Sequence, residues 1–221
     1  DLFGPRGWYD NIDGDWVLRD RMSSMLEKFK QICTQNNVIE FTENGLTLNI
    51  WYENSVRYIH VSTEGNTAFQ KQVTCLPEPD PKYKASGPAT LTNGVKGTED
   101  YKINWLGWEA SDVEIVLDLG SVEKINQIEL STLQYPKSWI THPVSVSCQL
   151  SKDGKKYNEP VTLYSSDNLQ TEPMMKAFAF NNAGTKTRYI KFTITATKAL
   201  PAWHAYAGLK SWVFVDEIVV K

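Results

Sequence analysis

The sequence has no surplus of basic residues. Its 221 residues include 23 Lys and Arg against 26 Asp and Glu, which gives a formal net charge of −3. A protein that follows the phosphates of DNA or RNA needs surplus cations to displace counterions, so this composition argues against a nucleic-acid partner. Long apolar runs are lacking as well, and none approaches the ~20 residues that cross a bilayer as a helix. We therefore expect neither a nucleic-acid partner nor a transmembrane segment.

Cysteine is scarce, and familiar catalytic signatures are missing. Cys33, Cys75 and Cys148 are odd in number and widely spaced, with no C-x-x-C motif or neighbouring His pair. This pattern predicts neither a disulfide framework nor a zinc site, and Cys33 and Cys148 are expected to be buried small hydrophobes. We find no nucleophile elbow, no H-E-x-x-H motif, no phosphate-binding glycine loop and no carboxylate pair suited to glycoside cleavage. The chain is therefore expected to be non-catalytic.

Residues 1–76 combine a helical pattern with strand-like runs. The chain begins at Asp1 with neither an initiator Met nor a signal peptide, which favours the tail of a longer protein over the product of leader removal. Apolar residues at three- and four-residue steps predict an amphipathic helix over 15–37. Strand-like runs follow at 38–41, 46–52, 56–61 and 69–73. We interpret 1–76 as a small α+β unit or as the end of a preceding domain.

Pro77, Pro79 and Pro81 mark the predicted boundary. Proline cannot donate to a sheet ladder and favours extended backbone, so we expect 77–88 to be a linker. Short runs of alternating apolar and polar residues follow, separated by Gly, Asp-Gly and Pro turns. The clearest runs are 113–119, 125–133, 144–150, 161–164, 175–180, 188–195 and 213–220. With no helix between them, they predict that 89–221 is mainly β, an antiparallel sandwich or barrel.

Aromatic residues make up 12% of the chain, and several Trp lie in segments that read as loops. Most of these rings, including Trp105 and Trp212, are expected in the core. The C–H face of a pyranose packs against an aromatic ring, and its hydroxyls need polar partners such as Lys, His and Asn. On this basis the candidate carbohydrate-binding residues are Asn104, Trp108, Lys137, Trp139, Trp203 and His204. Trp108 and Trp139 fit a core role equally well, whereas no strand periodicity explains the pair Trp203-His204.

The order of several short motifs resembles a known family. Leu91-Thr92-Asn93-Gly94 is followed by Trp105-Leu106-Gly107-Trp108, then by Val116-Leu117-Asp118-Leu119-Gly120, and finally by Phe214-Val215-Asp216-Glu217 in the last run. This order is similar to the factor V/VIII type C, or discoidin-like, domain, and closer to its bacterial branch, carbohydrate-binding module family 32. The resemblance covers 89–220. It implies a discoidin-type jelly roll that binds carbohydrate through loops at one pole.

The same resemblance implies a structural Ca²⁺ site. Members of the family often hold this ion through loop carbonyls, an acidic or amide side chain after the first strand and a Glu in the last strand. The matching positions are Asn93 and Glu217, with backbone oxygen from Leu91 and the residues that follow it to Gly97. Asn93 stands where Asp is usual, which removes one charge and lowers the expected affinity for Ca²⁺.

The resemblance also implies a setting for the chain. It is similar to the C-terminal region of chitobiase-like glycoside hydrolases of Bacteroides-type bacteria, which are secreted, periplasmic or on the cell surface. On this hypothesis the chain is a monomeric module that targets the attached catalytic domain to a glycan of the N-acetylhexosamine or galactose class. Residues 1–76 are then the end of the hydrolase domain or a small accessory unit. The alternative is an adhesion, protein-interaction or purely structural role on the same fold.

Overall fold

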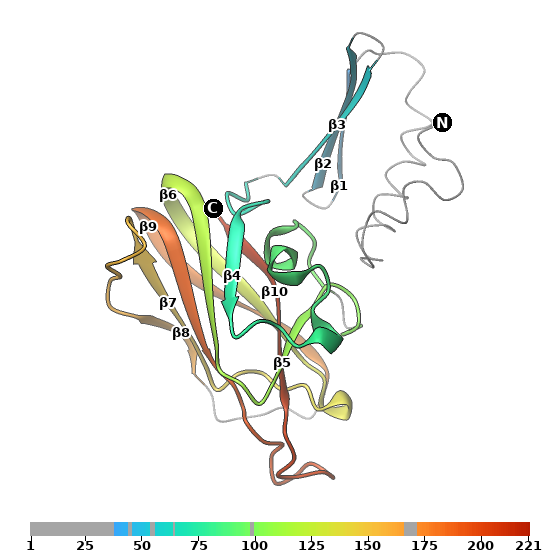
Figure 1. The fold of residues 1–221 in the computed structure, drawn as a ribbon, viewed down its shortest axis with the longest axis vertical. Coiled ribbons are helices and arrows are strands. Elements are labelled where there is room, and N and C mark those ends of the chain that lie inside the picture. The colour runs from blue at the N-terminus through green and yellow to red at the C-terminus, as the bar shows by residue number, and fades with distance from the viewer. Residues whose placement is uncertain (1–37, 44–45, 54–55, 64, 98–99, 166–171) are drawn as a thin grey trace, which may run out of the picture.

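The computed structural model describes residues 38–43, 46–53, 56–63, 65–97, 100–165 and 172–221. Its first strands are β1 (Val38–Glu43), β2 (Leu46–Glu53) and β3 (Val56–Thr63), which form an antiparallel sheet in chain order (Figure 1). The pairing has no register shift, and the backbone of Ile50 in β2 pairs with Ile39 of β1 and with Ile59 of β3. The three runs predicted between 38 and 61 are therefore confirmed as strands. The helix predicted over 15–37 lies outside the described residues.

The remaining described residues form an antiparallel β-sandwich. Its strands are β4 (Gln72–Leu76), β5 (Leu106–Glu109), β6 (Val113–Gln134), β7 (Ser145–Ser151), β8 (Val161–Ser165), β9 (Met174–Thr195) and β10 (Trp212–Val220). Short 3₁₀ turns lie in the connections: η2 (Pro81–Tyr83), η3 (Gly87–Thr92) and η4 (Pro136–Ser138). Every strand pair is antiparallel, so the predicted mainly-β sandwich is confirmed. None of the helices in the described part of the chain has the length and hydropathy that crossing a bilayer requires.

Two long strands, β6 and β9, contribute to both layers of the sandwich. The first part of β6 pairs with β4 and with the end of β9, which also pairs with β7, and β7 in turn pairs with β8. After a register shift between Asp118 and Glu123, β6 pairs with the start of β9 and with β10, which in turn pairs with β5. Gly120 lies at this shift with φ +86°, a conformation that favours glycine. The two strands bend together there, at the upper left of Figure 1, and as a result the β6–β9 pair contributes to both facing sheets.

The core lies between the two layers. Period-two alternation directs Ile115 and Leu117 inward from the first part of β6, and Ile128 and Leu130 inward from the second part. All four side chains are fully buried in one cluster. Burying each large apolar side chain stabilises the fold by about 1.5–3 kcal/mol. Cys148 lies in the same core as a free thiol, which confirms its predicted role as a small hydrophobe.

The N-terminal edge of the sandwich differs from the predicted boundary. β4 pairs with β6, with Cys75 opposite Ile115, and Ala68 is fully buried in the same core. The carbonyl oxygen of Pro77 accepts a hydrogen bond from Nε1 of Trp108 at 2.9 Å. The prediction that placed 65–76 outside the sandwich and made 77–88 a linker is therefore wrong. Proline removes a backbone donor but keeps its carbonyl acceptor, and the sandwich uses this acceptor.

Candidate functional site

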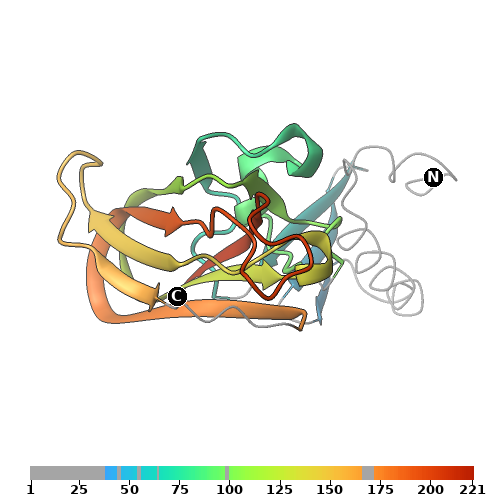
Figure 2. The same cartoon turned by 90° about the horizontal axis from the view of Figure 1, so that it is seen from below.

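Two loops meet at the pole of the sandwich where β10 begins. One contains η4 and Trp139, and the other is the connection 196–211 between β9 and β10; they lie beside each other in Figure 2, in yellow and red. The N–H of Trp212 donates to the carbonyl oxygen of Trp139 at 2.8 Å, which fixes the first loop against β10. Within the second loop, the N–H of Leu200 donates to the carbonyl oxygen of Leu209 at 2.8 Å. Backbone hydrogen bonds thus position side chains from distant parts of the sequence at one pole.

A set of five side chains, called here the loop cluster, occupies this pole: Lys137, Trp139, Trp203, His204 and Tyr206. Its rings form a connected series. Ring centroids are 5.8 Å apart between Trp203 and His204, 6.0 Å between His204 and Tyr206, and 5.5 Å between Tyr206 and Trp139. Trp203 is 47% exposed, Tyr206 is 56% exposed, and Lys137 is exposed on η4. The structure therefore brings the predicted residues Trp139, Trp203 and His204 together, and the predicted Lys137 lies two positions before Trp139 on η4.

Tyr206 was not among the predicted site residues, although it connects the two loops. It lies in the segment 200–206, which combines aromatic and polar residues, two positions after His204. Its ring approaches that of Trp139 only because the two loops fold against each other. The composition of the loop could have indicated Tyr206, but its contact with Trp139 could not be read from the sequence.

His204 holds the two loops together. Its Nδ1 accepts a hydrogen bond from the N–H of Tyr206 at 3.0 Å, so the neutral ring carries its proton on Nε2. Nε2 is 3.0 Å from the carbonyl oxygen of Pro136 and donates to it. Both ring nitrogens are therefore engaged with backbone. His204 positions the exposed rings around it, and its nitrogens are not free for a ligand.

Trp139 has an unusual backbone conformation for a bulky residue. It follows η4 with φ +65°, in the left-handed region, and its N–H donates to the carbonyl oxygen of Pro136 at 2.8 Å. Such a conformation costs about 1–3 kcal/mol and persists only where the surroundings enforce it. Strain of this kind is concentrated at binding sites, where it aims a side chain. Here it accompanies the contact between the rings of Trp139 and Tyr206.

Trp108 and Asn104 do not belong to the loop cluster. Trp108 lies in β5, is 1% exposed and packs in the core. Asn104 is buried, and its Nδ2 donates to Oδ1 of Asp216 at 3.0 Å. The prediction that these two side chains bind carbohydrate is therefore wrong, because neither is accessible. β5 is too short to show alternation, and the partner of Asn104 is 112 residues away in the sequence.

Asn104 instead contributes to a buried polar cluster at a bulge in β10. Val215 pairs with Thr132 and Ile218 pairs with Leu130, so Asp216 and Glu217 together oppose a single residue of β6. A β-bulge of this kind interrupts strict alternation, and both carboxyl groups are buried here. The set consisting of Asn66, Asn93, Asn104, Asp216 and Glu217 is called here the carboxylate cluster.

Asp216 and Glu217 accept hydrogen bonds from the loop that precedes β5. The N–H of Gly94 donates to Oε1 of Glu217 at 3.1 Å, and the N–H of Gly97 donates to Oδ2 of Asp216. Asn93 supports the same loop, because its Oδ1 accepts from the N–H of Val95 at 2.9 Å. The carboxylate cluster therefore connects the loop 93–97 to the last strand.

Glu217 also bonds with Asn66, which precedes β4. Nδ2 of Asn66 donates to Oε1 of Glu217 at 3.2 Å, while Oε2 is buried and has no hydrogen-bond partner among the described residues. Burial, followed by the nearby charge of Asp216, raises the pKa of Glu217 to about 9. Without a further cation, Glu217 is therefore protonated at neutral pH.

The carboxylate cluster contains the residues expected to hold Ca²⁺. Ca²⁺ takes six to eight oxygen ligands, and this region offers the buried Oε2 of Glu217, the neighbouring Asp216, amide oxygens and the carbonyls of the loop 91–97. The side chain of Leu91 is fully buried in the core, so it can contribute only its backbone oxygen. In the described ranges, no three His, Cys, Asp or Glu side chains are grouped as a metal site, so backbone and amide oxygens would complete the set. The oxygen-rich donor set fits Ca²⁺.

Strand order, bend and bulge define the chain as a discoidin-type β-sandwich module. The family model of the F5/8 type C domain matches residues 70–215, and the chain belongs to this family. The family predicted from the motif order is thereby confirmed. No curated protein matches the chain.

Several solved structures are similar to this chain. A chitosan-binding module from a chitosanase/glucanase of Paenibacillus sp. IK-5 is 14% identical, with a TM-score of 0.42; the match covers 71% of this chain and 98% of that one. A Streptococcus pneumoniae fucose-binding module is 12% identical, with a TM-score of 0.48 and coverage of 71% and 96%. A Clostridium perfringens protein in complex with GlcNAc-α-1,4-galactose is 14% identical, with a TM-score of 0.44 and coverage of 70% and 92%.

Proposed function

We propose that this chain is a non-catalytic glycan-binding module and that the loop cluster is its ligand site. The observation that carries the proposal is the meeting of two distant loops, which presents Trp203 and Tyr206 to solvent beside Trp139. Exposed aromatic side chains that lie together beside polar residues are typical of a recognition surface. Hydrogen bonds through His204 hold these rings in place before a ligand arrives, which lowers the entropic cost of binding.

The chemistry of the loop cluster suits a saccharide. The ring faces of Trp203 and Tyr206 can pack against the C–H face of a pyranose, and Lys137 supplies three N–H donors for hydroxyls. The site lies on exposed loops and would bury little of a ligand, so we expect a Kd on the order of 0.1–1 mM. Sugars of the N-acetylhexosamine or galactose class are the proposed ligands.

The wider role proposed for the module is targeting. We propose that it belongs to a secreted, periplasmic or cell-surface bacterial protein in which it tethers a chitobiase-like glycoside hydrolase to its substrate. A weak module serves this purpose because binding to a polymer raises the effective concentration of substrate near an attached catalytic domain. Family membership and the loop cluster support this role.

Titration with N-acetylglucosamine, N-acetylgalactosamine and galactose, after a glycan array, tests the proposal. We expect Trp203→Ala and Tyr206→Ala each to weaken binding at least ~10-fold, since each removes a stacking surface. Val122→Ala is the matched control: Val122 is 48% exposed at the bend of β6, far from the loops, and its loss should leave the Kd unchanged. Unchanged binding in both aromatic variants would exclude the loop cluster as the site.

An adhesion role through the same loops is the second candidate. Leu209 is 48% exposed, and its N–H donates to the carbonyl oxygen of Tyr206, so an apolar side chain lies beside the exposed rings. Side chains of this kind also suit protein surfaces and lipid headgroups. Absence of glycan binding at millimolar concentration, together with liposome binding that is lost in Leu209→Ala, would replace the glycan proposal with this one.

We also propose that the carboxylate cluster holds a structural Ca²⁺. Glu217, Asp216 and oxygens of the loop 91–97 would supply the ligands, and the ion would fix this loop to β10. Because a ligand of the folded state raises the melting temperature, Ca²⁺ added to chelator-treated protein should raise Tm. Glu217→Gln should abolish this rise. A Tm that does not respond to millimolar Ca²⁺ would refute the proposal.

A further inference from the structure

The pole opposite the loop cluster contains a cavity. Along β7, Ser145 pairs with Thr195 near the loop cluster and Ser151 pairs with Tyr189 at the other end of the sandwich. Beyond Ser151, the β7–β8 connection and the bend of β9 line an open hollow of about 340 Å³, called here the cavity. This pole is at the upper left of Figure 1, whereas the loop 196–211 is at the bottom. The two ends of the module therefore offer separate surfaces.

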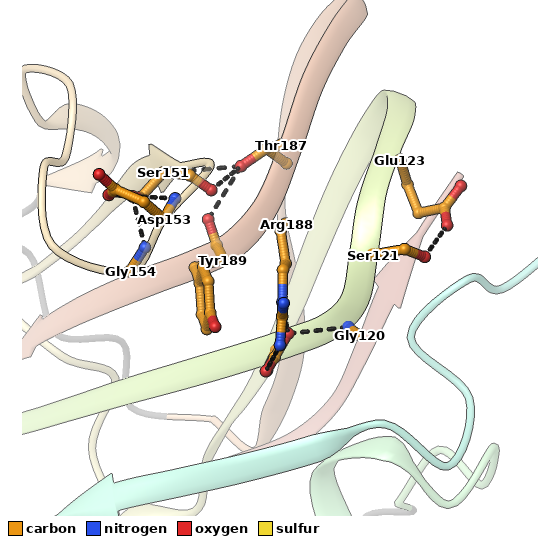
Figure 3. Close-up of polar contacts among 10 residues, drawn as sticks. Gly120, Ser121, Glu123, Ser151, Asp153, Gly154, Thr187, Arg188 and Tyr189 are labelled. Atoms are coloured by element: carbon orange, nitrogen blue, oxygen red, sulfur yellow. Dashed lines mark hydrogen bonds and ion pairs between the residues drawn. The ribbon is translucent and has the colours of Figure 1, made fainter.

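The floor of this cavity is ordered by hydrogen bonds. The N–H of Ser151 donates to Oγ1 of Thr187 at 3.2 Å, and Oγ1 of Thr187 donates to the carbonyl oxygen of Ser151 at 2.9 Å (Figure 3). Oγ of Ser151 accepts from the N–H groups of Asp153 and Gly154 at 3.3 and 3.0 Å. Ser151 and Thr187 are both buried. The start of the β7–β8 connection is thus fixed to β9 before any ligand binds.

Three lysines surround this floor. Lys152, Lys156 and Lys186 line the cavity, their side chains are exposed, and none forms an ion pair with another residue in the described ranges. Four lysines elsewhere in the sandwich pair with a carboxylate, as Lys198 does with Asp112 at 2.8 Å. Three cations at one pole are notable in a chain whose net charge is −3. They make this pole locally positive.

Two carboxylates near the lysines, Asp153 and Asp118, have hydrogen-bond partners of their own. Asp153, which also lines the cavity, accepts from the N–H groups of Lys155 and Lys156 at 2.9 Å each, and these backbone bonds lower its pKa to about 2. Asp118 is bound to Arg188 through two hydrogen bonds of 2.7 and 2.9 Å. The cavity lining therefore carries three positive charges and one negative charge.

We infer that this cavity binds a sulfate or carboxylate group of an acidic glycan. Ammonium groups on flexible stems can surround an oxyanion, and the cavity volume is within the range that holds one saccharide unit. The inference extends the proposed glycan-binding function to a second site. The loop cluster would bind the neutral face of a sugar, and the cavity would bind a charged substituent elsewhere on the same polymer or on a different one.

Titration of the chain with a heparin hexasaccharide at several salt concentrations tests the inference. We expect the triple variant Lys152→Gln, Lys156→Gln, Lys186→Gln to weaken binding at least ~10-fold and to lower the slope of log Kd against log salt by about one per lysine in contact. The control triple Lys82→Gln, Lys84→Gln, Lys102→Gln makes the same change in net charge at exposed lysines away from the cavity. It should stay within about two-fold of wild type. Arginines at the three cavity positions should retain binding.

Each outcome separates the cavity from the loop cluster. Equal loss in both triple variants would show that overall charge drives binding and would overturn the inference, as would wild-type protein that does not bind the hexasaccharide. Loss in Trp203→Ala without loss in the cavity triple would assign acidic glycans to the loop cluster and overturn it as well. If neutral sugars fail to bind while heparin depends on the three lysines, the function proposed for the loop cluster fails and the cavity site stands. A hyaluronan hexasaccharide, which carries carboxylates without sulfate, then distinguishes the two anions.

Discussion

The loop cluster and the carboxylate cluster represent two different uses of residues that lie in loops or at strand ends. In the loop cluster, Trp203 and Tyr206 leave about half of their surfaces in solvent and depend on His204 for their position. In the carboxylate cluster, Asp216 and Glu217 are buried, and hydrogen bonds from other segments surround them. Substitution in the first region should change binding with little effect on stability. Substitution in the second should change stability first.

The same contrast separates two tryptophans, Trp108 and Trp203. Both are candidate binding residues on the sequence alone, but Trp108 packs in the core and Trp203 lies on the surface of a loop. The free energy that a side chain contributes to folding depends on the surface removed from water and on the cavity that its loss would leave. Identical side chains at the two positions therefore have opposite roles.

The largest effect is expected for Trp108→Ala. Loss of a buried indole leaves a cavity and removes its hydrogen bond to Pro77, so the free energy of unfolding should fall by about 3–5 kcal/mol. Trp203→Ala should change it by less than about 0.5 kcal/mol. Urea denaturation followed by circular dichroism measures both. Similar decreases in the free energy of unfolding for the two variants would contradict the assignment of Trp108 to the core and Trp203 to the surface.

A smaller loss is expected for Asn66→Ala. The Asn66 side chain donates to Glu217 and to the carbonyl oxygen of Ile218, and it accepts from the N–H groups of Ala68 and Val220. Its removal should lower the free energy of unfolding by about 2–3 kcal/mol, because partners in the interior are left unpaired.

Asn126→Ala provides the matched control for this variant. The exposed Asn126 side chain accepts one bond, from the N–H of Gly184 at 3.0 Å, and its loss should cost about 0.5 kcal/mol. If Asn66→Ala were as stable as this control in the same denaturation experiment, the carboxylate cluster would not be a stabilising centre.

The smallest effect is the pH dependence that arises from Glu217. Its pKa is about 9 in the folded state against 4.5 ordinarily, so between these values the folded state holds a proton that the unfolded state releases. Stability should therefore fall as pH rises, by at most about 1.4 kcal/mol per pH unit between pH 7 and 8.5 in chelator. Glu217→Gln should lose this slope because it cannot ionise, and Ca²⁺ should reduce it in the wild type by favouring the ionised form. A wild-type profile as flat as that of Glu217→Gln would contradict the assignment.

Much of the sandwich could be predicted from local patterns. In 113–119 and 188–195, apolar residues alternate with polar ones, which is the pattern of strands with one buried face. The family could also be identified from the motif order, because each motif is a short run of neighbouring residues. The N-terminal limit was misplaced because β4 alternates over only five residues, and its partner in β6 lies about forty residues further along the chain. A short run can be recognised as a strand, but its sheet is set by pairing.

The candidate site was only partly predictable for the same reason. Trp139 and Trp203 were selected because neither fits a strand, and both lie in the loop cluster. Asn104 was selected by the same reasoning, yet it is buried beside Asp216. Polar residues in loops have similar local patterns whether they face solvent or a buried carboxylate, because the distinction depends on which distant segment covers them.

The sequence by itself determined that this protein is mainly β, that its strands have one buried face and that it belongs to the discoidin-type family, since period-two alternation and motif order are properties of neighbouring residues. Tertiary structure decided which tryptophans are exposed, which asparagine supports a carboxylate and where three unpaired lysines gather. Those outcomes depend on contacts between segments far apart in the chain. The free energies of burial and charge pairing that govern them exist only once the two layers have closed around the core.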